Sequence, residues 1–121
     1  FVRENEVPAY YTAWKLFCLP SVQKTEAFGI VQIEAMSSAK PVVATKIPGS
    51  GVAWVNEHGV SGLNVTPGNP QEIAEAIQAI IEDEQTYQMF AEGARKRYET
   101  YFTQEKMLEK AIDIYNNVLK A

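Results

Sequence analysis

Short apolar runs alternate with longer segments of helical periodicity along the chain of 121 residues. The runs 16–19, 41–45 and 62–65 are mostly apolar, which is typical of strands buried on both faces of a parallel sheet. Helical segments separate these runs, and such alternation favours an α/β fold with right-handed crossover connections. We therefore predict a three-layer, Rossmann-like partial domain with a small parallel sheet and C-terminal helices.

Residues suited to helix capping mark where several helices begin. Asn69 is predicted to cap a helix that has Pro70 at its first position and Glu72 placed for a capping box. Asn5 and Thr103 are predicted to cap the first and the last helix. Further helices are predicted over residues 28–38, 52–57 and 84–100, which have apolar positions at helical spacing.

Composition narrows the class of protein. The net charge of −4 and the scattered basic residues argue against a nucleic-acid surface, and Arg95, Lys96 and Arg97 are interpreted as a solvated helix face. Cys18 is the single cysteine and lies in an apolar run, so we expect a buried structural thiol. The one histidine, His58, is expected at the surface, and no metal-ligand spacing is present. No apolar run is long enough to span a membrane.

The loop after the first predicted strand carries the residues best suited to chemistry. Ligands of open α/β sheets bind at the carboxyl ends of the strands. The backbone N–H groups of Phe28, Gly29 and Ile30 are predicted to lie at a helix N-terminus, where they favour a phosphate or a diphosphate. Glu26 and Glu34 flank this anion site, eight positions apart, which would span ~12 Å in a helix. A carboxylate repels phosphate but accepts hydrogen bonds from adjacent sugar hydroxyls, so the pattern indicates a nucleoside diphosphate sugar.

The stretch from Glu26 to Glu34, Glu-Ala-Phe-Gly-Ile-Val-Gln-Ile-Glu, resembles the E-x7-E signature of retaining glycosyltransferases of the GT-B fold, especially family 4, also called group 1. Leu-Pro-Ser at 19–21, Pro-Val-Val-Ala-Thr at 41–45 and Pro-Gly-Asn-Pro at 67–70 extend the resemblance over nearly the whole chain. The order of these flanking motifs makes the resemblance specific, whereas an isolated E-x7-E would be weak evidence.

The resemblance implies a role for each matching residue. Glu26 would be the catalytic residue that contacts and orients the transferred sugar, and Glu34 would hold the ribose hydroxyls of the donor. The donor would also contact the backbone from Ala27 through Phe28 and Gly29 to Ile30. The reaction would retain the anomeric configuration and would require neither a bound metal nor a cofactor, with a nucleotide-diphosphate sugar as the substrate.

The same resemblance implies that residues 1–121 are the C-terminal part of a nucleotide-sugar-binding domain. The acceptor domain and a basic pair that neutralises the diphosphate would lie upstream, and the chain opens on Phe1, so we expect an excerpt that is inactive alone. The stretch 47–56 departs from the common Gly-Gly-hydrophobic-Pro-Glu pattern and resembles bacterial polysaccharide-building enzymes. The acceptor would be a glycan or a lipid-linked glycan, in the cytoplasm or peripherally at the inner membrane.

Other interpretations stay open at this point. The chain could be a non-catalytic nucleotide-sugar-binding or interaction module, and a GT-B nucleotide-sugar epimerase ranks lower. Glu34 could be a solvated helix residue, and Gly29 could serve packing alone. Trp54 could anchor the core or line a pocket, whereas Tyr10 and Tyr11 are assigned to the core. The exposed faces of the last helix would also permit a homodimer.

Overall fold

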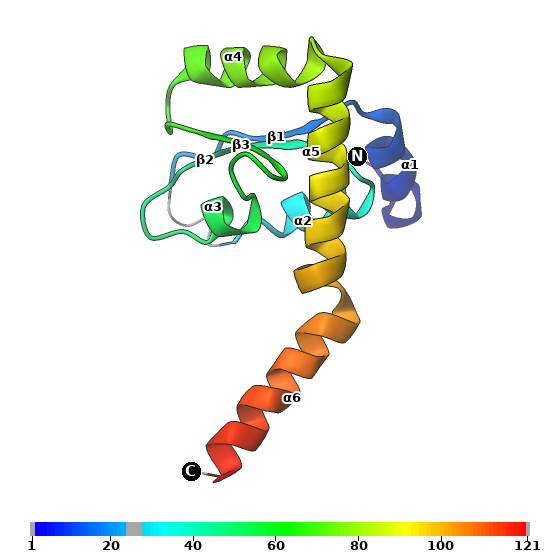
Figure 1. Ribbon diagram of the computed structural model, residues 1–121, viewed down its shortest axis with the longest axis vertical. Coiled ribbons are helices and arrows are strands. Elements are labelled where there is room, and N and C mark those ends of the chain that lie inside the picture. The colour runs from blue at the N-terminus through cyan, green and yellow to red at the C-terminus, as the bar shows by residue number, and fades with distance from the viewer. Residues whose placement is uncertain (1, 24–27, 121) are drawn as a thin grey trace.

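A parallel sheet of three strands in the order β1-β2-β3 forms the centre of the computed structural model, which describes residues 2–23 and 28–120 (Figure 1). The strands are β1 (Phe17–Leu19), β2 (Val42–Thr45) and β3 (Gly62–Val65). The register pairs Phe17 with Val42, and Val42 with Gly62. The predicted α/β fold with a small parallel sheet is thus confirmed, and β3 has the predicted bounds.

Helices cover both faces of the sheet (Figure 1). The helix α4 (Pro70–Ile81) lies on one face, and α2 (Ile30–Ser37) and α3 (Val52–Val55) lie on the other. The helix α5 (Glu84–Arg97) runs across the edge of these layers and contacts both α2 and α4. This arrangement is the three-layer architecture that the sequence predicts.

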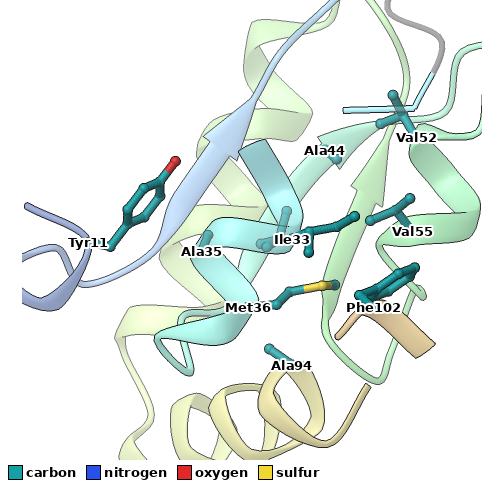
Figure 2. Packing of buried hydrophobic residues seen from close by; sticks show 10 residues of the cluster. Tyr11, Ile33, Ala35, Met36, Ala44, Val52, Val55, Ala94 and Phe102 are labelled. Carbon is teal, nitrogen blue, oxygen red and sulfur yellow. The ribbon is translucent and has the colours of Figure 1, made fainter. Parts of the chain in front are cut away.

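Two apolar clusters fill the space between the layers. Side chains point alternately to the two faces of a strand, so Val42 and Ala44 enter the cluster on the α2 side and Val43 enters the cluster on the α4 side. Figure 2 shows the first cluster, in which Met36 of α2 lies near Ala94 of α5. The second cluster contains Val43, Val65, Ala76, Ile80, Tyr87, Phe90 and Ala91.

The N-terminal segment differs from its prediction. Asn5 does not cap a helix, because it lies within a 3-10 turn, η1 (Glu4–Glu6), which leads directly into α1 (Val7–Ala13). The start of this turn is held by the Glu6 carboxylate, which accepts a hydrogen bond of 3.1 Å from the Arg3 N–H. Tyr11 is buried as predicted, whereas Tyr10 was wrongly assigned to the core, because 46% of it is exposed.

The start of α4 confirms one half of the predicted capping box. The Asn69 side chain accepts a hydrogen bond of 3.1 Å from the Glu72 N–H. The Glu72 carboxylate does not return to Asn69 but accepts a hydrogen bond of 3.3 Å from the Thr66 N–H. The Asn69 N–H donates to the Thr66 carbonyl instead. The reciprocal bond of a capping box is therefore replaced by a contact with the preceding turn.

The predicted helix over residues 84–100 ends earlier than expected. The helix α5 stops at Arg97 and continues as a wider π turn, η2 (Tyr98–Phe102). The Thr103 hydroxyl then accepts a hydrogen bond of 3.1 Å from the Lys106 N–H and caps α6 (Gln104–Lys120), as predicted.

The helix α6 extends away from the rest of the domain (Figure 1). Every residue of α6 is exposed, so its apolar side chains, which the sequence predicts as a packing face, do not pack on this domain. No helix among the described residues combines the length and the apolar character needed to cross a membrane.

Candidate functional site

The N-terminus of α2 lies at the carboxyl edge of the sheet, where the loop after β1 enters the helix. This helix begins two residues later than predicted, because Gly29 takes a left-handed conformation with φ 70° and ψ 59°. A Cβ at Gly29 would also lie 2.8 Å from Gln32 Nε2 and 2.9 Å from Leu19 Cδ2. The left-handed conformation therefore favours glycine at this position, whereas the two close atoms are ends of flexible side chains that could shift.

Gly29 closes the first turn of α2 and leaves the next N–H groups without an acceptor in the helix. The Gly29 carbonyl accepts a hydrogen bond of 2.9 Å from the Gln32 N–H. The N–H groups of Ile30 and Val31 have no acceptor within the helix, because they belong to its first turn. Together with the helix dipole, these groups favour a negatively charged ligand. Phe28 precedes the helix rather than opening it.

Glu26 and Ala27 lie outside the described residues, so their predicted contacts stay predictions. The second carboxylate of the predicted pair, Glu34, lies in the middle of α2 and is exposed. Of the predicted pair, the described residues therefore include Glu34, which lies four positions after the first residue of α2.

Glu34 lies beside a cavity of about 300 Å³ and close to a buried tyrosine. Burial, a hydrogen bond with Glu34 and the charge of Glu34, in that order, raise the pKa of Tyr11 to about 12. The Tyr11 hydroxyl also lies 3.5 Å from the Val31 carbonyl, which is the outer limit for a hydrogen bond. Figure 2 shows Tyr11 at the margin of the apolar cluster. The lining residues are Glu4, Val7, Pro8, Tyr11, Glu34, Ser37 and Ser38.

Sequence reasoning assigned Tyr11 to the core and missed its contact with Glu34. The ring of Tyr11 packs in the apolar cluster, and Tyr11 also lines the cavity beside Glu34, whose charge helps to raise the pKa of Tyr11. The two residues are 23 positions apart, and no local pattern in the sequence connects them. Glu34 is exposed, but it faces a cavity and a hydroxyl group rather than open solvent alone.

Hydrogen bonds join the loops that follow β1 and β2. The buried Thr45, at the end of β2, donates its hydroxyl to the Ser21 carbonyl at 2.5 Å. The Gln32 side chain is fully buried, and its Nε2 lies 3.4 Å from the Phe28 carbonyl and 3.3 Å from the Val52 carbonyl. The loop that enters α2 is therefore tied both to β2 and to the start of α3.

Arg97 is buried, which corrects its prediction as part of a solvated basic face. Only 8% of it is exposed, and its guanidinium donates to the carbonyls of Val55, at 2.9 Å, and Trp54. It also forms an ion pair of 2.9 Å with Glu57. The π turn after Arg97 brings aromatic rings around the guanidinium, whose carbon lies 5.0 Å from the centre of the Tyr101 ring. Arg97 therefore fixes the C-terminal end of α3.

Trp54 lines a pocket rather than anchoring the core. Half of Trp54 is exposed, and its ring centre lies 6.0 Å from that of Phe28 and 5.5 Å from that of Phe102. These rings form one wall of a cavity of about 500 Å³, and residues of α6 form the other wall. Phe28 therefore connects the N-terminus of α2 with an aromatic surface on the side of α6.

A buried polar network joins the segment after α3 to β3. The Asn56 amide donates to the Val42 carbonyl at 3.1 Å and to the Asn64 side chain at 3.0 Å, and the Ser61 hydroxyl donates to Asn56 Oδ1 at 2.7 Å. His58 is exposed, as predicted, and its Nδ1 accepts a hydrogen bond of 2.9 Å from the Asn64 N–H. These bonds give the histidine a structural role.

Two further groups bear on chemistry. Cys18 is partly buried, and burial raises the pKa of its thiol, which keeps it protonated and unreactive. Within residues 2–23 and 28–120, no group of three or more histidine, cysteine, aspartate or glutamate side chains is arranged to hold a metal ion.

A family model and individual relatives indicate the same class of protein. A family model described as "Glycosyl transferases group 1" matches residues 1–97. The O-antigen chain mannosyltransferase C of Escherichia coli is 31% identical over 84% of the chain, and the capsular polysaccharide biosynthesis glycosyltransferase CapM of Staphylococcus aureus is 33% identical over 93% of it. The chain spans 27% and 28% of the length of these two relatives.

A solved structure of Anabaena HepE in complex with UDP is similar in fold and in sequence. It superimposes with a TM-score of 0.85 and 33% identity over 95% of the chain, which corresponds to 30% of HepE. A second structure of HepE contains UDP-glucose. Since the chain spans less than a third of each of these proteins, it corresponds to one portion of a larger architecture.

Proposed function

Because the chain belongs to the group 1 family of glycosyl transferases, we propose that it is the donor-binding portion of a retaining enzyme. This enzyme transfers a sugar from a nucleotide sugar to a glycan or a lipid-linked acceptor in bacterial surface polysaccharide synthesis. Residues 1–121 form the C-terminal part of the nucleotide-sugar-binding domain. The observation that carries the proposal is the juxtaposition on α2 of a helix N-terminus and a carboxylate that faces a cavity.

The spacing of these two features suits a nucleoside diphosphate. The diphosphate binds the N–H groups of Ile30 and Val31, where the helix dipole is favourable. Glu34 lies one helical turn further along α2, about 6 Å from Ile30 along the axis. A ribose attached to the diphosphate reaches this carboxylate, which accepts hydrogen bonds from two adjacent hydroxyl groups. The nucleoside then enters the cavity beside Tyr11.

Tyr11 supports Glu34 in this role. With a pKa of about 12, the Tyr11 phenol keeps its proton at neutral pH and donates a hydrogen bond toward the carboxylate. In this scheme the contact orients Glu34 toward the bound ribose.

The chemical step requires stabilisation of the departing diphosphate. The amides at the start of α2 point at the place where negative charge develops as the glycosidic bond to the diphosphate breaks, and this use of fixed dipoles lowers the barrier. Glu26 orients the transferred sugar. No metal and no cofactor take part in this scheme. We place the reaction in the cytoplasm, where the full-length enzyme meets its acceptor at the inner membrane.

Titration with nucleotides tests the donor site directly. We expect UDP or GDP, alone or as UDP-glucose or GDP-mannose, to shift the amide NMR signals of Ile30, Val31 and Glu34 most strongly. Glu34→Gln should weaken nucleotide binding about tenfold, which is about 1.4 kcal/mol. The matched control Glu92→Gln changes an exposed carboxylate on α5 and should leave the affinity unchanged.

Two results would contradict the proposal. Nucleotides that shift no amide signals, or that shift signals scattered over the surface, would exclude a donor site on α2. Binding at α2 without sugar transfer by the full-length protein would favour a non-catalytic nucleotide-sugar-binding module instead.

A further inference from the structure

The side chain of Gln32 is a polar group in an apolar interior. It is fully buried on α2, next to the buried residues Ile33 and Met36. Its Nε2 faces the carbonyls of Phe28 and Val52, whereas its Oε1 has no hydrogen-bond partner among the described residues. Two carbonyls on one side of the amide fix its orientation, because only the NH2 group can donate to them.

This arrangement contributes little to folding. The contacts of Nε2 are 3.4 Å and 3.3 Å long, beyond the usual range for strong hydrogen bonds. The buried Oε1 has lost its hydrogen bonds to water, and no hydrogen bond within the protein compensates for this desolvation penalty. Methionine has a similar volume and would fill the same space without that penalty, so stability alone does not explain a glutamine here.

We propose that Gln32 is a positioning residue for the diphosphate cradle, by which we mean the N–H groups from Gly29 to Val31. Its amide holds this cradle by joining the loop at Phe28 to the start of α3 at Val52. This inference rests on the proposed function of α2 as the donor site. Gln32 acts through the backbone and does not itself touch the donor, because it is buried beneath Gly29.

The geometry of one peptide unit gives the mechanism. The Phe28 carbonyl and the Gly29 N–H belong to the same planar peptide group. A donor placed on that carbonyl fixes the direction of the Gly29 N–H and polarises it, because hydrogen bonds in a chain strengthen one another. The second contact, with the Val52 carbonyl, ties this peptide to the start of α3. Without the amide, the same N–H groups would be present in the cradle, but their directions would be less firmly fixed.

Substitution by methionine separates this role from a structural one. We expect Gln32→Met to leave the midpoint of thermal unfolding unchanged or higher, while the Kd for UDP rises about tenfold, which is about 1.4 kcal/mol. In the free protein, the Gly29 amide proton signal should move upfield, since its peptide group is less polarised. Gln32→Leu gives a second apolar probe of different shape if the methionine variant folds poorly.

A control on the same helix tests for a general disturbance of α2. Ile33→Met changes a buried neighbour that makes no hydrogen bond to the loop, and it should leave the Kd for UDP unchanged. A lower unfolding midpoint together with an unchanged Kd in Gln32→Met would show a purely structural residue and overturn the inference. If the unaltered protein gives no UDP-dependent shifts at α2, the proposed function itself fails and this inference falls with it.

Discussion

The two faces of the sheet differ in what they bury. The α4 side holds an apolar cluster that includes Val43, Ile80 and Phe90. The α2 side combines its own apolar cluster with five of the six buried polar or charged side chains of the described residues, Thr45 being the sixth. These polar residues are Gln32, Asn56, Ser61, Asn64 and Arg97.

The difference indicates that the two sides of the sheet contribute different kinds of interaction. Apolar burial stabilises both sides of the sheet, and it is not directional. Hydrogen bonds are directional, so the α2 side can fix the backbone groups of a site. Substitutions on the two faces should therefore separate stability from ligand binding.

The largest expected effect is on the α4 side. Ile80→Ala removes a fully buried side chain and should lower the free energy of unfolding by about 2–5 kcal/mol, because it leaves a cavity. Below the unfolding transition, the Kd for UDP should stay unchanged. Denaturant unfolding and UDP titration measure the two quantities, and a weakened nucleotide affinity in the folded variant would break the comparison.

Substitution of Arg97 should have a smaller effect on the free energy of unfolding and should also loosen the surroundings of Trp54. Arg97→Ala should lower the free energy of unfolding by about 2–3 kcal/mol, because the carbonyls of Trp54 and Val55 lose a buried partner. Trp54 fluorescence should shift as its surroundings loosen. The neighbouring exposed Lys96→Ala should change stability by no more than about 0.5 kcal/mol. Equal effects of the two substitutions would contradict the buried role of Arg97.

The smallest expected effect concerns pH. The pKa of Tyr11 is raised from 10.0 to about 12, so the folded state holds its proton more tightly than the unfolded state. The stabilisation from this group is complete below pH 10 and is lost as the pH rises toward 12. Glu34→Gln removes the neighbouring charge and should move the pKa of Tyr11 back toward 10.0 in a spectrophotometric titration. An unchanged pKa in this variant would show that the two residues do not interact.

The fold was predictable wherever the signals are local. The strand at 62–65 and the cap at Asn69 were predicted correctly, because periodicity and capping depend on residues a few positions apart. The burial of Arg97 was missed, because it depends on a π turn and on carbonyls 42 and 43 positions away. A run of three basic residues gives no local sign that one of them turns inward.

The candidate site was predictable in part for the same reason. Gly29 and Glu34 stand out in the sequence, and the structure places them at the start and in the middle of one helix. Tyr11 and Gln32 were missed as members of the site, because their contacts join segments about 20 positions apart. The roles of Glu26 and Ala27 stay predictions.

The exposed helix α6 has a consequence for the stability of the chain. Its 17 residues make a helix of about 25 Å that is supported by the Thr103 cap, an ion pair of 3.7 Å between Lys106 and Glu109, and contacts with η2 at its start. Most helical stability in proteins comes from the packing of an amphipathic face. A surface that covers the exposed apolar side chains of α6 would therefore stabilise this helix through burial that the described residues do not provide.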